Sequence, residues 1–100
     1  MGAIIIRPRM TNPSKMYPSA KGYFDFKNLE YEVTEGNGGF VKTIELLNNE
    51  ILIYNKNPQT QDSSKNYLAN KILEELLPVE EKGLEIFGTC IIISKDLINN

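Results

Sequence analysis

The chain has 100 residues, of which 41% are hydrophobic and 24% are charged, and its formal net charge is −2. This length predicts one domain over residues 1–100, and no apolar stretch reaches the roughly 18 residues of a membrane span. The absence of histidine and the single cysteine exclude Ser-His-Asp catalysis, histidine zinc sites and an internal disulfide. Catalysis by paired carboxylates or lysine stays open, but no such pair stands out. We therefore expect a cytoplasmic protein that is not an enzyme and holds no metal or cofactor.

The N-terminal part is predicted to form a buried strand followed by a long loop. Residues 2–7 read Gly-Ala-Ile-Ile-Ile-Arg, an aliphatic run with polar flanks that is typical of a strand buried on both faces. The polar loop from Arg9 to Ala20 is punctuated by prolines, which exclude a helix there. A short strand is predicted next, over residues 22–26.

Residues 29–35 support two interpretations. The alternation of Leu29, Tyr31 and Val33 with polar residues favours a strand, whereas Asn28 before the segment and Gly36 after it are typical of the caps of a short helix. Both interpretations stay open on this pattern alone.

The central part is predicted to be a hairpin followed by a polar loop and a helix. Strands over residues 40–47 and 51–54 flank Asn48-Asn49, a two-residue turn signal. The loop from Asn55 to Lys65 then leads into a helix whose apolar side chains form one stripe and which ends before Pro78. The stripe consists of Leu68, Ala69, Ile72, Leu73 and Leu76.

The C-terminal part is predicted to be an acidic surface connector and a closing strand. Five glutamates lie between positions 74 and 85, residues 86–93 form a second aliphatic run, and the closing strand is predicted over residues 86–94. Cys90 lies inside this run, where we expect it to be a buried, unreactive thiol. The two aliphatic runs should lie side by side in the middle of one sheet.

These elements predict an α+β fold with a small single sheet of about four strands and one or two helices on one face. If residues 28–35 are helical, the order is β-α-β-β-α-β, the ferredoxin-like or split βαβ arrangement. In that arrangement the first and third strands are parallel neighbours in the sheet centre.

Four motifs together suggest a relationship. The chain opens with Gly-Ala-Ile-Ile-Ile-Arg-Pro, a glycine pair precedes an aromatic and a β-branched residue at 38–42, the helix carries Leu-Ala-Asn-Lys at 68–71, and the closing strand contains Phe-Gly-Thr-Cys-Ile-Ile at 87–92. This combination resembles a family of short uncharacterised proteins of phages and mobile elements, a domain of unknown function. In that family the segment before the glycine pair looks helical, which favours a helix over residues 29–35, although this chain has an insertion at 34–37. The resemblance implies no activity; it implies a setting in which small proteins bind and block host factors.

The predicted topology brings two polar loops to one edge of the sheet. Parallel strands release their following loops at the same edge, where ligands of such sheets bind. Residues 1–24 carry four basic residues and no acid, and the second loop leads into a helix N-terminus, which favours anions. We therefore predict a site for a small phosphorylated ligand or nucleotide, with tyrosines available to stack on a base. Its candidate residues are Arg7, Arg9, Lys15, Tyr17, Lys56, Asn57, Gln59, Thr60, Ser63, Ser64, Tyr67 and Asn70.

Two hypotheses of function follow. The first is a non-enzymatic counter-defence protein that sequesters a phosphorylated or cyclic-nucleotide signal of the host. The second is a protein-binding inhibitor that uses the acidic surface from Glu74 to Glu85 against a host enzyme.

Three further expectations concern Asn70, DNA and oligomers. Asn70 also has a structural interpretation, a hydrogen bond to the backbone of the adjacent loop. Direct DNA binding is disfavoured by the net charge, and a homodimer or higher oligomer is plausible because a sheet of this kind has open edges.

Overall fold

The two aliphatic runs pair with each other in the centre of the sheet, as predicted. The computed structural model describes residues 2–36, 40–56 and 64–99. Strand β1 (Ala3–Ile6) is antiparallel to β6 (Cys90–Ser94), and the register pairs Ala3 with Ile93 and Ile6 with Cys90. Their side chains are buried on both faces, apart from the half-buried Ile4 and Ser94. Strands β1 and β6 therefore form the centre of the fold.

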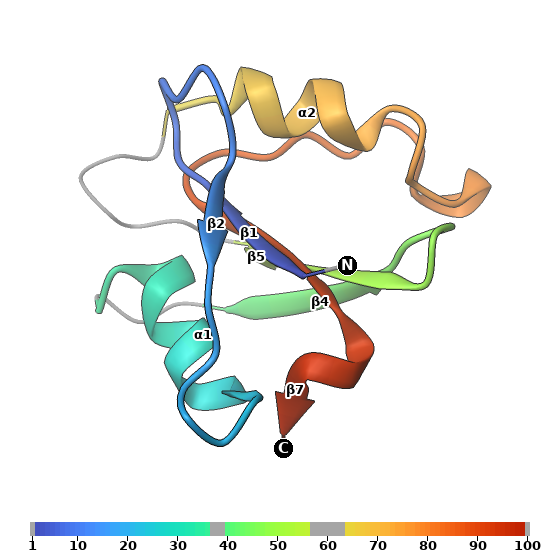
Figure 1. The fold of residues 1–100 in the computed structure, drawn as a ribbon. Coiled ribbons are helices and arrows are strands. Elements are labelled where there is room, and N and C mark those ends of the chain that lie inside the picture. Colours follow the sequence, from blue (N-terminus) through green and yellow to red (C-terminus); the bar gives the residue numbers. More distant parts are fainter. Residues whose placement is uncertain (1, 37–39, 57–63, 100) are drawn as a thin grey trace.

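The remaining elements are short and lie around this central pair (Figure 1). They are β2 (Ser14–Met16), β3 (Phe24–Asp25), α1 (Phe26–Thr34), β4 (Val41–Glu45), β5 (Glu50–Asn55), α2 (Tyr67–Leu73), β7 (Ile98–Asn99) and two 3-10 helices, η1 (Val79–Glu81) and η2 (Lys95–Leu97). In the described ranges no helix is long and apolar enough to cross a membrane.

The fold is α+β in class, as predicted, but the prediction of one sheet with about four strands differs from the structure, which has a five-stranded sheet and a separate two-stranded sheet of β3 and β7. Five strands follow the order β2-β1-β6-β5-β4, and each neighbouring pair is antiparallel. The prediction that the first and third long strands are parallel neighbours is wrong, because β6 lies between β1 and β5. The closing strand carries the most completely buried run of the chain, Cys90–Ile93, so the centre of the sheet is where it buries most apolar surface. Both β1 and β5 are antiparallel to β6, so they still point in the same direction.

The two helices cover opposite faces of the sheet, so the expectation of helices on one face is wrong (Figure 1). Helix α1 packs Leu29 and Val33 on one face, and α2 packs Ala69 and Leu73 on the other. Successive strand residues point to opposite faces, so a strand that is apolar throughout requires cover on both. The α1 face consists of Ala3, Ile5, Ile53, Ile91 and Ile93; the α2 face includes Ile6, Leu52, Tyr54, Cys90 and Ile92.

Residues 26–34 form helix α1, which settles the two interpretations of this segment. Leu29 and Val33 are buried four positions apart, whereas Tyr31 is 64% exposed. The strand-like alternation was misleading because one of its three members faces solvent. The helix ends at Glu35, which has a left-handed φ of 56°, followed by Gly36 with φ 76°. This ending matches the predicted C-terminal glycine signal.

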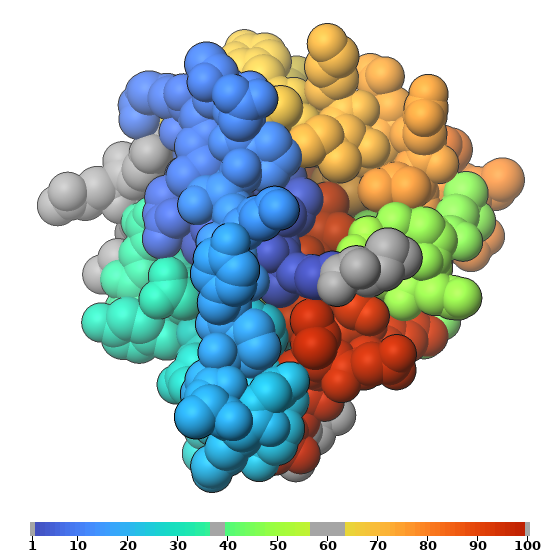
Figure 2. Space-filling view, in the orientation of Figure 1, coloured from blue at the N-terminus to red at the C-terminus, as the bar shows by residue number. Residues whose placement is uncertain are grey.

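The loop after β1 contains the short strand β2, which is not predicted from the proline-punctuated sequence. Residues 14–16 pair with β1 between Pro13 and Pro18, so both proline rings lie outside the ladder. The blue N-terminal segment runs along the surface from the α2 side to the α1 side of the molecule (Figure 2).

Two other predicted elements have different outcomes. The predicted strand over residues 22–26 is reduced to β3, which pairs with β7. The predicted hairpin is confirmed, and Asn49 in its turn has φ 68°.

Candidate functional site

A buried asparagine fixes the start of α2, next to the predicted site. Asn66 is fully buried, and its Nδ2 donates to the carbonyls of Ile6 at 2.9 Å and of Gly88 at 2.8 Å. Its Oδ1 accepts a hydrogen bond from the Ala69 backbone N–H at 3.2 Å and so caps the helix. This side chain joins the end of β1, the segment before β6 and α2.

The second asparagine of this segment, Asn70, is engaged in the same way. Its Nδ2 donates to the carbonyls of Asn66 at 2.8 Å and of Ile86 at 3.2 Å, and its Oδ1 accepts from the Ile86 N–H at 2.8 Å. The structural interpretation of Asn70 is thus confirmed. Because α2 has only seven residues and Asn66 already caps it, we do not place an anion at the helix end.

The two predicted polar loops meet on the outer side of this segment. Arg9 Nη2 donates to Ser64 Oγ at 3.2 Å, which joins residues 55 positions apart. The carbonyl of Ser64 accepts a hydrogen bond from the Gly88 N–H at 2.8 Å, so the serine backbone is tied to the core strand segment. Arg9 has a left-handed φ of 71°, which costs a residue other than glycine on the order of 1 kcal/mol. The fold therefore holds Arg9 in an unusual backbone conformation beside Ser64.

Lys65 and Tyr67 extend this surface. Lys65 Nζ lies 5.4 Å from the centre of the Tyr67 ring and 2.8 Å from Glu85 Oε2. The hydrogen bond that Lys65 donates to the Glu85 carboxylate raises the pKa of Lys65, so the ammonium stays charged at neutral pH. The Tyr67 side chain is 73% exposed. We call Arg9, Ser64, Lys65 and Tyr67 together the α2 rim.

Lys65 was absent from the predicted site residues. The sequence signal for it is a basic residue two positions before an aromatic one at the start of the predicted helix. Lys65 forms a β-bridge with Phe87, Asn66 caps the helix, and Tyr67 is the first residue of α2. The basic and aromatic side chains therefore come together.

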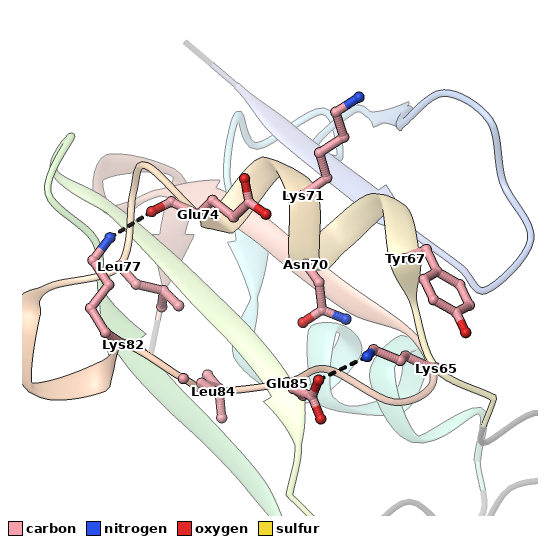
Figure 3. A pocket seen from close by; sticks show the side chains of 10 residues that line it. Lys65, Tyr67, Asn70, Lys71, Glu74, Leu77, Lys82, Leu84 and Glu85 are labelled. Carbon is pink, nitrogen blue, oxygen red and sulfur yellow. Dashed lines mark hydrogen bonds and ion pairs between the residues drawn. The ribbon is translucent and has the colours of Figure 1, made fainter.

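A groove of about 660 Å³ adjoins the α2 rim, between α2 and residues 82–85 (Figure 3). Leu77 and Leu84 are among its apolar lining residues, whereas Lys65 stands at one end and Lys82 at the other. Lys82 Nζ donates to the backbone carbonyl of Glu74. The remaining lining residues are Tyr67, Asn70, Lys71, Glu74, Gly83 and Glu85, and Lys71 points away from segment 82–85.

Among the described residues, four further predicted site residues do not belong to the α2 rim: Arg7, Lys15, Tyr17 and Lys56. Arg7 forms an ion pair with Glu32 of α1 at 3.2 Å, and Lys56 donates its backbone N–H to the Phe40 carbonyl. Lys15 and Tyr17 line a separate hollow of about 540 Å³ beside β1 and β2, which shares no residue with the groove. Asn57, Gln59, Thr60, Ser63 and the glycine pair at 38–39 lie outside the described residues.

Basic groups interrupt the acidic stretch. Glu85 is paired with Lys65, and Lys82 lies against the backbone of Glu74. Val79 and Glu80, by contrast, are exposed on η1, and Val79 is 84% exposed.

Two buried groups have raised pKa values. Burial, together with the charge of Glu81, raises the pKa of Tyr54. Burial also raises the pKa of the Cys90 thiol to about 12, so this cysteine stays protonated and unreactive at neutral pH.

Comparisons of the chain with models of protein families, with curated proteins and with solved structures each returned no match. The resemblance to short phage proteins therefore stays a prediction. Within the described ranges, no group of three or more acidic, cysteine or histidine side chains is arranged to hold a metal ion.

Proposed function

We propose that this protein is a non-enzymatic binding protein for a small phosphorylated ligand, which it holds at the α2 rim. The observation that carries the proposal is the contact between Arg9 and Ser64, which joins two polar loops beside Lys65 and Tyr67. In the setting implied by the resemblance, the ligand would be a nucleotide signal of the host, sequestered as a counter-defence.

Each rim side chain has a chemical role in this proposal. The Arg9 guanidinium forms paired, charge-assisted hydrogen bonds with a phosphate, and the Ser64 hydroxyl adds a donor. Lys65 supplies a second positive charge within reach of the same ligand. The exposed Tyr67 ring offers a face on which a base stacks. The groove next to the rim has room for the rest of a nucleotide.

Isothermal titration against a nucleotide panel tests the proposal. The panel contains inorganic phosphate, nucleoside mono- and triphosphates, and cyclic mono- and dinucleotides. We expect at least one nucleotide to bind, and Arg9→Ala to weaken that binding by at least about tenfold, because a hydrogen-bonded charge contributes about 1.5–3 kcal/mol.

Lys27→Ala is the matched control, because it removes one positive charge from an exposed position on α1, which covers the opposite face of the sheet. Its affinity should equal that of the wild type. Absence of binding across the panel, or equal losses in the two variants, would refute the proposal.

A protein partner that contacts η1 is the second candidate, favoured by the exposed Val79 beside Glu80 and Glu81. Reversal of both charges, Glu80→Lys with Glu81→Lys, should then abolish capture of the partner and leave nucleotide binding unchanged. If the double variant lost nucleotide binding instead, the two surfaces would have to be one site.

A further inference from the structure

Strand β4 forms one edge of the sheet, and none of the described strands pairs with its outer side. The Leu46 N–H donates to the Glu50 carbonyl at 2.8 Å, and the Lys56 N–H donates to the Phe40 carbonyl at 2.7 Å. Hydrogen-bonded positions alternate along an antiparallel strand, so the even-numbered residues of this strand bond to β5. The backbone groups of Val41, Thr43 and Glu45 consequently point outward.

Large apolar side chains flank this open edge. Phe40 precedes β4 and is 70% exposed, and Leu47 follows the strand and is 66% exposed. A single exposed apolar side chain is common on a protein surface. Here, however, two of them lie at the two ends of one strand, on whose outer side none of the described strands pairs.

The opposite edge of the sheet is protected in a way that β4 is not. Strand β2 has three residues and is flanked by Pro13 and Pro18, which cannot donate to a further strand. Strand β4 has five residues and no proline. Of the two edges, β4 is therefore the one that can accept another strand.

We propose that β4 pairs with β4 of a second copy of this chain, antiparallel and centred on Thr43. Only this register brings all three outward-facing residues of one copy opposite those of the other. Thr43 then faces Thr43 of the partner copy, and Val41 faces Glu45, with two hydrogen bonds exchanged in each pair. The two sheets become one continuous sheet.

The side chains fit this symmetric pairing. Phe40 of one copy lies opposite Leu46 and next to Leu47 of the other, which covers both exposed apolar ends. Lys42 faces Ile44, so like charges do not directly oppose each other. Glu45 is already neutralised by Lys95, whose Nζ lies 2.7 Å from its carboxylate. It therefore does not bring an unpaired charge to the contact.

Sedimentation velocity over concentrations from about 5 to about 500 µM tests this proposal. We expect the wild type to form dimers in this range. Thr43→Pro should weaken dimer formation by about thirtyfold or more, since each copy loses one outward N–H worth about 1 kcal/mol. Its fold should survive, because the Thr43 N–H is not used in the ladder with β5. Thr43→Val is the matched control and should dimerise like the wild type.

Amide hydrogen exchange supplies the second measurement and does not depend on a variant. In the dimer the N–H groups of Val41, Thr43 and Glu45 should exchange more slowly as the protein concentration rises. A wild type that stays monomeric to about 500 µM would overturn the proposal. So would a dimer that persists unchanged in Thr43→Pro, or one in which these three amides gain no protection.

Discussion

The inward and outward sides of the segment 64–70 use polar side chains for different purposes. Facing inward, Asn66 and Asn70 direct both ends of their amides to backbone groups of β1, α2 and residues 86–88. Facing outward, Lys65 and Tyr67 are joined to their surroundings by one ion pair and one ring contact at the surface. Polar residues that look alike in the sequence thus divide into a buried group that links backbone segments and a group at the surface, where we propose that the ligand binds. Variants of each side should therefore change different measured quantities.

The largest expected effect is on the inward side. Asn66→Ala leaves the carbonyls of Ile6 and Gly88 without their buried donor and removes the cap of α2. We expect a loss of about 3–5 kcal/mol in the free energy of unfolding, measured by urea titration, because several buried partners are left unsatisfied together. Asn28→Ala, at an exposed position of α1, is the control and should lose less than about 1 kcal/mol. If the two variants lost similar amounts of unfolding free energy, the structural role of Asn66 would be contradicted.

Tyr67→Ala should change binding rather than stability. The ring is mostly exposed, so its removal should alter the free energy of unfolding by about 0.5 kcal/mol or less. Loss of a stacking surface should weaken nucleotide binding by about fivefold to a hundredfold, measured by the same titration calorimetry. Tyr17→Ala is the control, because Tyr17 is equally exposed but lies in the other hollow. Binding that depends on Tyr17 and not on Tyr67 would move the site away from the α2 rim.

The smallest effect should come from the ion pair at the edge of the groove. Glu85 shares the Lys65 ammonium with any anion that binds there, so Glu85→Gln should strengthen nucleotide binding. A surface pair is worth at most about 1 kcal/mol, which limits the gain to about fivefold. Glu30→Gln on α1 should leave the affinity unchanged. Weaker binding in Glu85→Gln would show that Glu85 contacts the ligand itself.

Much of the chain could be predicted because its signals are local. The aliphatic runs, the Asn48-Asn49 turn and the apolar stripe from Leu68 to Leu73 each depend on neighbouring residues, and the structure confirms them. The predicted helix was too long, because α2 ends at Leu73 and leaves Leu76 outside it. The insertion of β6 between β1 and β5 depends on which strands bury most together, which no local pattern specifies. Strand β2 could not be predicted, because Pro13 and Pro18 are typical of a loop, whereas the three residues 14–16 between them pair with β1.

At the candidate site, too, some features could be predicted from the sequence and others could not. The meeting of the two loops could be predicted, because β1 and β5 run in the same direction even though β6 separates them. The role of Asn66 could not, because its partners lie 60 and 22 positions away in the sequence. A polar residue at the border of a helical stripe is usually exposed, and only the folded backbone turns this one into a buried link.

Chemical-shift mapping of the ¹⁵N-labelled protein is the sharpest test of whether the α2 rim binds a phosphorylated ligand. Adenosine and guanosine monophosphates and a cyclic dinucleotide serve as probes. We expect saturable shifts at the amides of Arg9, Ser64, Lys65 and Tyr67, with little change on α1. Shifts absent for every probe, or centred on Lys15 and Tyr17 in the other hollow, would contradict it.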